Sequence, residues 1–262
     1  MDMSEKSNVI EGKQYKYYDL GQGVDTIFFL HGLGASKEIL AKVALDFAHK
    51  YRCIVMDLPG HNGIELYGFM DIKAIASYVK ALILQLGIKS PHLIGFSMGG
   101  LVATELANDY PDIKSVTLWA VPVNSKSSLT IRTKALRWLV NHIPSVMYNK
   151  MYTVEYLEKL SKFLKMPLYK NEAKAMSQLR QKDFCKLMDI LNKHCFNKRF
   201  TCPNLLVYGT KDPLISKVHI EKLSKQFIES VKIVDRGGHF GSHDGWNQSI
   251  AHIKEFISSV GA

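Results

Sequence analysis

The chain of 262 residues lacks the features that define several classes of protein. Its first residues, MDMSEKSNVIEGK, contain no apolar run of the kind that a secretory signal peptide needs. The most apolar helical stretch, VKALILQLGI, includes a lysine and is too short to cross a bilayer. Sequence repeats, low-complexity tracts and proline-rich linkers are also absent. These absences predict a cytoplasmic protein without a transmembrane segment.

Cysteine is rare in the chain, which contains Cys53, Cys185, Cys195 and Cys202. None of the four forms a C-x-x-C pair, and their spacing does not fit a zinc site. A chain of this length can bury a sizeable core without disulfides or metals. We therefore expect free thiols, with Cys53 in the core, and neither a metal nor a cofactor.

The formal net charge of +10 is concentrated in one segment. Residues 124–200 contain 16 Lys and Arg against 5 Asp and Glu, a net charge of +11, whereas the rest of the chain carries −1. This asymmetry indicates a separate unit within the chain. A nucleic-acid partner is not expected, because no stretch resembles a nucleic-acid-binding motif.

Short apolar runs alternate with amphipathic helical stretches outside that segment. The runs DTIFFLHG, RCIVMDLPG, PHLIGF, SVTLWAVP, NLLVYG and VKIVD predict buried strands. Ser36 and Asp71 are the expected N-caps of two helices, and Gly87 follows the second one as a C′ glycine. The alternation predicts an α/β fold, a mostly parallel sheet with helices on both faces. KQYKYYDLG is expected to add an antiparallel edge strand.

Residues 124–200 interrupt this alternation, because they contain helical stretches such as TIRTKALRWLVNHI and KAMSQLRQKDFCKLMDILNKH but no convincing strand. Open α/β sheets bind ligands at the carboxyl ends of their strands. We therefore predict a core formed by residues 1–123 and 201–262, with residues 124–200 inserted as a helical cap over that edge. The cap is rich in apolar residues, which pack its own helices or line an acyl pocket.

The stretch HLIGFSMGGLVA places Ser97 among glycines where a predicted strand passes directly into a helix. This is the context of a nucleophile elbow, a turn so tight that side chains two residues away would collide. Gly95 and Gly99 remove those collisions, and Gly100 lets the helix pack close to a neighbouring strand. Taken alone, the pattern also fits an ordinary strand-to-helix turn.

Five blocks follow one another in a familiar order: FFLHGLG, VMDLPGH, GFSMGG, VYGTKDP and RGGHF. They cover nearly all of the chain outside the cap, and with them the chain resembles an α/β-hydrolase. The resemblance implies that Ser97 is the nucleophile, that His239 is the general base and then acid, and that Asp212 fixes the imidazole tautomer. It also implies an oxyanion hole made by the backbone N–H groups of Leu33 and Met98.

Other histidines compete with His239 for the role of base. His243 is the main rival, four residues further on. His31 and His61 lie in loops beside the expected site, and we interpret them as residues that brace the backbone.

Two other carboxylates compete with Asp212. Asp57 begins the block DLPGH, which resembles a structural loop of the family, and Asp235 lies too near His239 on a predicted strand to reach its ring. A metal site formed by His239, His243 and Asp244 is disfavoured by the intervening glycines.

One block departs from the family pattern. The continuation DLPGHGxS is here DLPGHNGIELYGF, with no serine or glycine in the usual places. The pocket wall that this loop forms is therefore not predicted, although the three triad positions are unaffected.

The resemblance implies a serine hydrolase that cleaves carboxylic esters of small to medium acyl chain through an acyl-enzyme. A carbon–carbon bond hydrolase, a thioesterase or a lyase would use the same fold and triad. The basic cap is a solvated face or attracts an acidic substrate, an acidic acyl carrier protein or anionic lipid. A non-catalytic ligand-binding protein is a further alternative, although no triad member is missing. The sequence does not predict the oligomeric state.

Overall fold

The fold is built on a sheet of eight strands. The computed structural model describes residues 3–122, 138–163, 170–194, 200–212, 214–215, 229–234, 237–239 and 245–260. The strands are β1 (Lys6–Ile10), β2 (Lys13–Leu20), β3 (Thr26–Leu30), β4 (Arg52–Met56), β5 (His92–Phe96), β6 (Ser115–Trp119), β7 (Asn204–Gly209) and β8 (Ser230–Val234). Their order across the sheet is β1-β2-β4-β3-β5-β6-β7-β8.

The six strands β4, β3, β5, β6, β7 and β8 are parallel to one another, whereas β2 pairs antiparallel with both β4 and β1. The expected strand at KQYKYYDLG is β2, and it is antiparallel as predicted. It is not the edge, however, because β1 pairs with its free side. β1 has the sequence KSNVI and is largely exposed, so it lacks the apolar pattern that would predict a strand.

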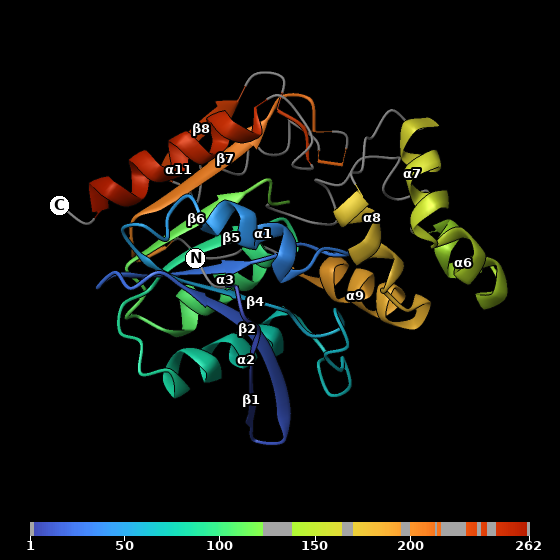
Figure 1. Ribbon diagram of the computed structural model, residues 1–262, viewed down its shortest axis with the longest axis horizontal. Helices are drawn as coiled ribbons and strands as arrows, with labels where there is room; N and C mark the ends of the chain where they lie inside the picture. The colour runs from blue at the N-terminus through green and yellow to red at the C-terminus, as the bar shows by residue number, and fades with distance from the viewer. Residues whose placement is uncertain are drawn as a thin grey trace.

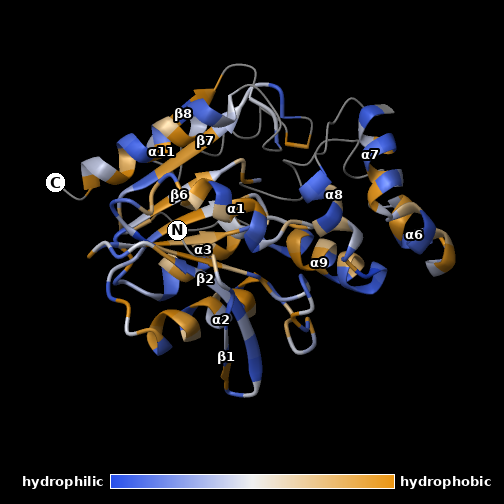
Figure 2. Cartoon of the chain, in the orientation of Figure 1, coloured by the Kyte–Doolittle hydropathy of each residue, from blue (hydrophilic) through white to orange (hydrophobic). Residues whose placement is uncertain are grey.

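Different helices cover the two faces of the sheet (Figure 1). One face packs against α1 (Lys37–Ala44) and α11 (Trp246–Val260), and the other packs against α2 (Ile72–Gln85) and α3 (Met98–Asp109). Alternate residues of β3 divide accordingly, with Phe29 toward α1 and Phe28 toward α2 and α3. The inner strands are coloured as apolar in Figure 2, while polar residues line the outer sides of the helices. The expected fold class is confirmed.

The predicted helix boundaries are mostly correct. The Asp71 carboxylate accepts a hydrogen bond from the Ala74 N–H at 2.8 Å, as an N-cap should. Gly87, just beyond α2, has a φ of +62°. Ser36 is the N-cap residue of α1, but its side chain makes no capping hydrogen bond.

Between β6 and β7 the described residues form helices and no strand. They are α6 (Ser145–Met151), α7 (Val154–Phe163), α8 (Lys170–Ser177) and α9 (Gln181–Lys193). In Figure 1, α6 and α7 lie farthest from the sheet, with α8 and α9 between them and the sheet. None of the helices in the described part of the chain has the length and apolarity that a bilayer span requires.

One expected helix is divided in the structure, and another lies mostly outside the described residues. The stretch KAMSQLRQKDFCKLMDILNKH is divided, because α8 ends at Ser177 and α9 begins at Gln181. Leu179 lies buried at the break, and its carbonyl accepts a hydrogen bond from Tyr148 Oη at 2.8 Å. Most of TIRTKALRWLVNHI lies outside the described residues.

The loop that departs from the family pattern contacts α9. A Cβ built on Gly60 would lie 3.0 Å from Leu187 Cδ1 of α9, so the helix touches the loop backbone. Lys186 Nζ donates a hydrogen bond to the Leu66 carbonyl at 3.2 Å. The loop of residues 57–69 therefore contacts α9 directly.

Three of the four cysteines lie in the described residues, and none of these three is in a disulfide. Cys53 is buried in β4, as expected, and its burial raises the pKa of the thiol to about 12. Such a thiol is protonated and unreactive at neutral pH. Cys195 lies outside the described residues.

Two buried histidines join the loop after β3 to the loop after β4. The His31 Nδ1–H donates to the Gly32 carbonyl at 2.8 Å, while His31 Nε2 accepts from the Leu58 N–H at 3.0 Å. His31 therefore bridges residues 32 and 58 with a neutral ring, because an Nε2 that accepts a hydrogen bond carries no proton.

His61 makes the reciprocal bridge from the second loop to the first. Its Nε2 accepts from the Gly34 N–H at 3.0 Å, and its Nδ1–H donates to the Pro59 carbonyl at 3.2 Å. Burial lowers the pKa of His31 to about 4. Burial and the neighbouring His31 ring lower the pKa of His61 to about 3. Both bridges are therefore complete at neutral pH.

This arrangement predicts a loss of stability in acid. The folded-state pKa of each imidazole lies below the unfolded value of about 6.5, so the unfolded chain binds more protons between that pH and pH 4. The free energy of unfolding is expected to fall by roughly 3 kcal/mol per imidazole as the pH falls through this window. Urea unfolding at several pH values measures the slope. The slope should be shallower in His61→Asn and unchanged in His49→Asn, an exposed control. Equal slopes in wild type and His61→Asn would contradict the account.

Candidate active site

Ser97 occupies the tight turn between β5 and α3. Its backbone has φ 50° and ψ −117°, a conformation that residues with a side chain rarely adopt. The Ser97 N–H donates to the Trp119 carbonyl on β6 at 2.9 Å, and the Gly100 N–H donates to the Ser97 carbonyl at 3.0 Å. These bonds hold the strained residue in place. The side chain is partly exposed at the carboxyl edge of the sheet.

The glycines around Ser97 lie where a side chain would collide. A Cβ on Gly95 would overlap the backbone of Gly100, and a Cβ on Gly99 would overlap the carbonyl of Leu30 on β3. A Cβ on Gly100 would meet the Val121 side chain, which lies just after β6. The helix therefore approaches the sheet as closely as the sequence predicts.

The structure brings Asp212 and His239 to Ser97, although the three residues are far apart in the chain. Asp212 follows β7, and His239 lies in the loop after β8. The His239 Nδ1–H donates to Asp212 Oδ2 at 2.7 Å, and the Ser97 hydroxyl donates to His239 Nε2 at 3.2 Å. The Nδ1 proton is assigned because an ionised carboxylate only accepts hydrogen bonds. This is the hydrogen-bonded chain expected of a nucleophile, a base and an orienting acid.

The Asp212 carboxylate is fixed from two sides. Its Oδ2 accepts from His239, while its Oδ1 accepts from the Leu214 N–H at 2.8 Å and the Ile215 N–H at 3.1 Å. The side chain has no exposed surface. These backbone donors orient the carboxylate toward the imidazole.

The expected oxyanion donors lie next to Ser97. A Cβ built on Gly32 would be 3.0 Å from Ser97 Cβ, so the loop after β3 passes directly over the serine. Leu33 follows in this loop, and Met98 is the first residue of α3. Among the described residues, neither of these two backbone N–H groups has an acceptor. Both are therefore available to a ligand beside the serine.

The competing residues are placed differently. His31 and His61 make backbone hydrogen bonds within the two loops, as interpreted from the sequence. Asp57 accepts from the backbone and side chain of Lys37 and lies away from the Ser97 contacts. The positions of His243, Asp235 and Asp244 fall outside the described residues.

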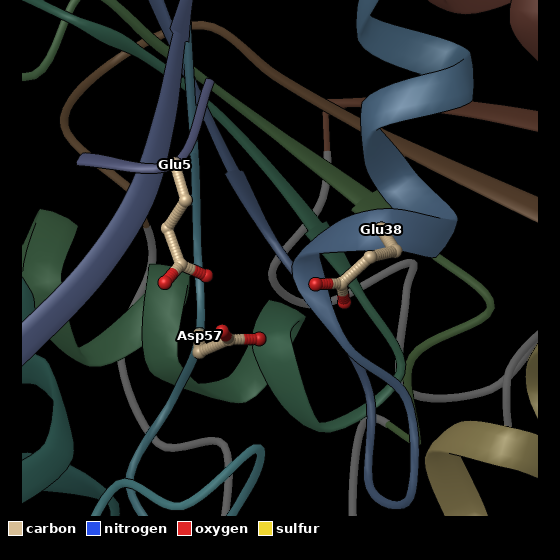
Figure 3. A group of neighbouring side chains, drawn as sticks. All are labelled: Glu5, Glu38 and Asp57. Atoms are coloured by element: carbon tan, nitrogen blue, oxygen red, sulfur yellow. The ribbon is translucent and has the colours of Figure 1, made fainter. Parts of the chain in front are cut away.

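One group of carboxylates in the described residues is close enough to hold a metal ion: Glu5, Glu38 and Asp57 (Figure 3). The buried ammonium of Lys37 lies among them, 2.7 Å from Glu5, 2.9 Å from Glu38 and 2.7 Å from Asp57. Its three N–H donors match the three carboxylates. Burial alone would lower the pKa of Lys37, but the Asp57 charge and the hydrogen bonds to all three carboxylates raise it above its ordinary value. The lysine thus supplies the cation that this group needs.

Two neighbours of the site were not predicted from the sequence. Met176 of α8 lies over the loop after β3, because its Cγ is 3.0 Å from a Cβ built on Gly34. The Phe96 ring packs against the His239 imidazole, with 5.2 Å between ring centroids. The only indication of Met176 in the sequence is the apolar composition of residues 124–200. Phe96 has the pattern of an ordinary core residue of β5.

Comparison with known proteins supports the fold. Residues 25–148 match a family model described as alpha/beta hydrolase fold. A solved epoxide hydrolase, CorEH, superposes with a TM-score of 0.80 at 18% identity, covering 99% of this chain and 100% of the other. At that identity the likeness concerns the fold alone.

Two curated relatives are similar in sequence. The pimeloyl-[acyl-carrier protein] methyl ester esterase of Aeromonas hydrophila is 27% identical over 261 residues, covering 90% of this chain and 96% of that protein. The dihydrolipoyllysine-residue acetyltransferase component of the acetoin cleaving system of Cupriavidus necator is 33% identical over 112 residues, or 42% of this chain. The chain spans only 30% of the length of that second relative.

The sheet order and the family-model match agree on the same fold. The chain therefore has the α/β-hydrolase fold, and residues 25–148 match the family model of that fold.

Proposed function

We propose that this protein is a serine hydrolase that cleaves carboxylic esters of small to medium acyl chain. The observation that carries the proposal is the continuous hydrogen-bonded chain from Ser97 through His239 to Asp212. Each member has the partner that its proposed role requires, and the serine is partly exposed at the sheet edge. The name of the Aeromonas relative, a methyl ester esterase, supports an ester as the substrate.

In the first half-reaction, Ser97 Oγ bonds to the ester carbonyl carbon while its proton passes to His239 Nε2. The carbonyl electron pair moves onto oxygen, where the N–H groups of Leu33 and Met98 would bind the developing charge. Asp212 stabilises the imidazolium. The tetrahedral intermediate then expels the alcohol, which takes the proton from His239 and leaves an acyl-enzyme on Ser97.

In the second half-reaction, water takes the place of the alcohol. His239 accepts a proton from the water as its oxygen attacks the acyl carbonyl, and then returns that proton to Ser97 Oγ as the acid leaves. All atoms of ester and water appear in the products.

A second candidate function is cleavage of an ester whose acyl group is attached to an acidic carrier protein. The printed name of the Aeromonas relative includes such a carrier. In this chain, α8 and α9 carry the exposed lysines Lys170, Lys174, Lys182 and Lys193, which would attract an acidic surface. A thioesterase or a carbon–carbon bond hydrolase would share the triad, but no observation favours either.

Replacing the nucleophile tests the proposal directly. Ser97→Ala is expected to abolish labelling by a fluorophosphonate probe and to lower kcat on p-nitrophenyl esters by about six orders of magnitude. Ser77→Ala, on an exposed side of α2, should label like wild type. Labelling of the Ser97→Ala protein would refute the choice of nucleophile, and an unlabelled wild type would refute the enzyme assignment.

Neutralising the orienting acid should leave the fold intact and remove most activity. Asp212→Asn keeps an oxygen for the Leu214 and Ile215 N–H groups but no longer selects the correct imidazole tautomer. We expect kcat on a p-nitrophenyl ester to fall about 10⁴-fold with little change in KM. Steady-state kinetics and a thermal melt measure both effects, with Asp109→Asn as an exposed control. A loss below tenfold would contradict the assigned role.

Charge reversal on α8 and α9 distinguishes a carrier-bound substrate from a small ester. Lys174→Glu with Lys182→Glu should lower kcat/KM on a carrier-bound acyl methyl ester at least tenfold and leave a p-nitrophenyl ester unaffected. Lys42→Glu with Lys89→Glu, exposed on the sheet domain, is the matched control. Added salt should weaken the carrier reaction only. A carrier protein is excluded as the partner if both double variants behave alike, or if salt has no effect on the reaction with the carrier-bound ester.

A further inference from the structure

The ring of Phe96 contacts two parts of the proposed active site at once. Phe96 ends β5 and directly precedes Ser97. Its ring centroid lies 5.2 Å from that of the His239 imidazole, with the two planes inclined by 47°. A Cβ built on Gly32 would lie 3.2 Å from Phe96 Cδ1, so the ring also touches the loop that carries Leu33. The base and the proposed oxyanion loop thus share one neighbour.

Two tryptophans hold this ring in position. Trp119, the last residue of β6, and Trp246, the first residue of α11, each lie edge-on to Phe96 with centroids 5.6 Å away. The two indoles contact each other at 4.0 Å. Phe96 and Trp119 are only 6% and 3% exposed, so the ring has no free volume in which to turn. Its position is therefore set by the sheet and by α11.

We propose that Phe96 is a positioning residue that holds the His239 imidazole toward Ser97 and stabilises the imidazolium formed during catalysis. The inference rests on the proposed function, in which His239 Nε2 takes the Ser97 proton. It assigns to an apolar residue of β5 a role that the triad hydrogen bonds do not cover, because those bonds are made by the nitrogen atoms of the imidazole, whereas Phe96 contacts the ring itself.

The electrostatic part of this role follows from the chemistry of the ring. The face of an aromatic ring carries partial negative charge and attracts a cation within about 6 Å of its centroid. The imidazole lies inside that distance in a site with little exposed surface, where the attraction is weakly screened. Asp212 faces the Nδ1 side of the imidazole and the Ser97 hydroxyl faces the Nε2 side. Phe96 adds a third stabilising contact, from β5.

Phe96→Leu tests the proposal because leucine fills much of the space but has no aromatic face. We expect kcat on a p-nitrophenyl ester to fall about tenfold with KM unchanged. The acidic limb of the pH profile of kcat/KM should move to lower pH by about half a unit, because loss of a stabilised imidazolium favours the neutral ring. Phe96→Tyr, which keeps the ring, should retain both properties.

Phe28→Leu is the matched control, since Phe28 is fully buried on β3 and packs toward the opposite face of the sheet. It loses the same atoms from the core without contacting His239. Thermal melts show whether each variant is folded, and Phe96→Met serves as a second ring-free variant if Phe96→Leu unfolds. The proposal is overturned if the ring-free variants keep the wild-type kcat and pH profile, or lose no more kcat than Phe28→Leu does.

An NMR titration makes the outcome independent of activity. The His239 ring resonance, assigned by its loss in His239→Gln, should titrate about half a unit lower in Phe96→Leu than in wild type. An unchanged midpoint overturns the inference even if the protein hydrolyses esters. A lowered midpoint in a protein that hydrolyses no ester supports the contact with Phe96 while refuting the proposed function.

Discussion

The tight turn at Ser97 is the constraint on which the rest of the site depends. A residue with a side chain in this backbone conformation is stable only when its surroundings hold it, and here the hydrogen bond from Ser97 to Trp119 does so. The same turn requires glycine at 95 and 99, since the backbones of α3 and β3 leave no space for a Cβ. The sequence around the serine is therefore determined by how closely the helix approaches the sheet.

The histidines around Ser97 have different roles because their surroundings differ. His31 and His61 are buried, bonded to backbone groups and neutral, and they join the loop after β3 to the loop after β4. His239 faces a carboxylate and a hydroxyl instead, which suits a ring that must gain and lose a proton. The two buried histidines join the loop that carries Leu33 to its neighbour, whereas His239 contacts the two side chains with which it is proposed to exchange a proton. The loop on one side of Ser97 is thus fixed by buried histidines, and the proposed base lies on the other side.

Local patterns were enough to predict the inner strands, α2 with its Asp71 cap, and the turn at Ser97. The order of the blocks was enough to select Asp212 and His239, which the structure brings to Ser97. Features set by contacts between distant segments could not be predicted. β1 is polar and is defined by its pairing with β2, and the break before α9 depends on Tyr148. Lys37 among three carboxylates and Phe96 beside His239 likewise leave no local signal.

The central claim is that Ser97 carries the acyl group between two half-reactions. Mass spectrometry of the enzyme, acid-quenched during turnover of an activated ester, tests it most directly. The account predicts one acyl group per chain, located on the peptide that contains Ser97, and its disappearance once the ester is consumed. An acyl group on another residue, or sustained turnover with no acylated enzyme at any time point, would contradict it.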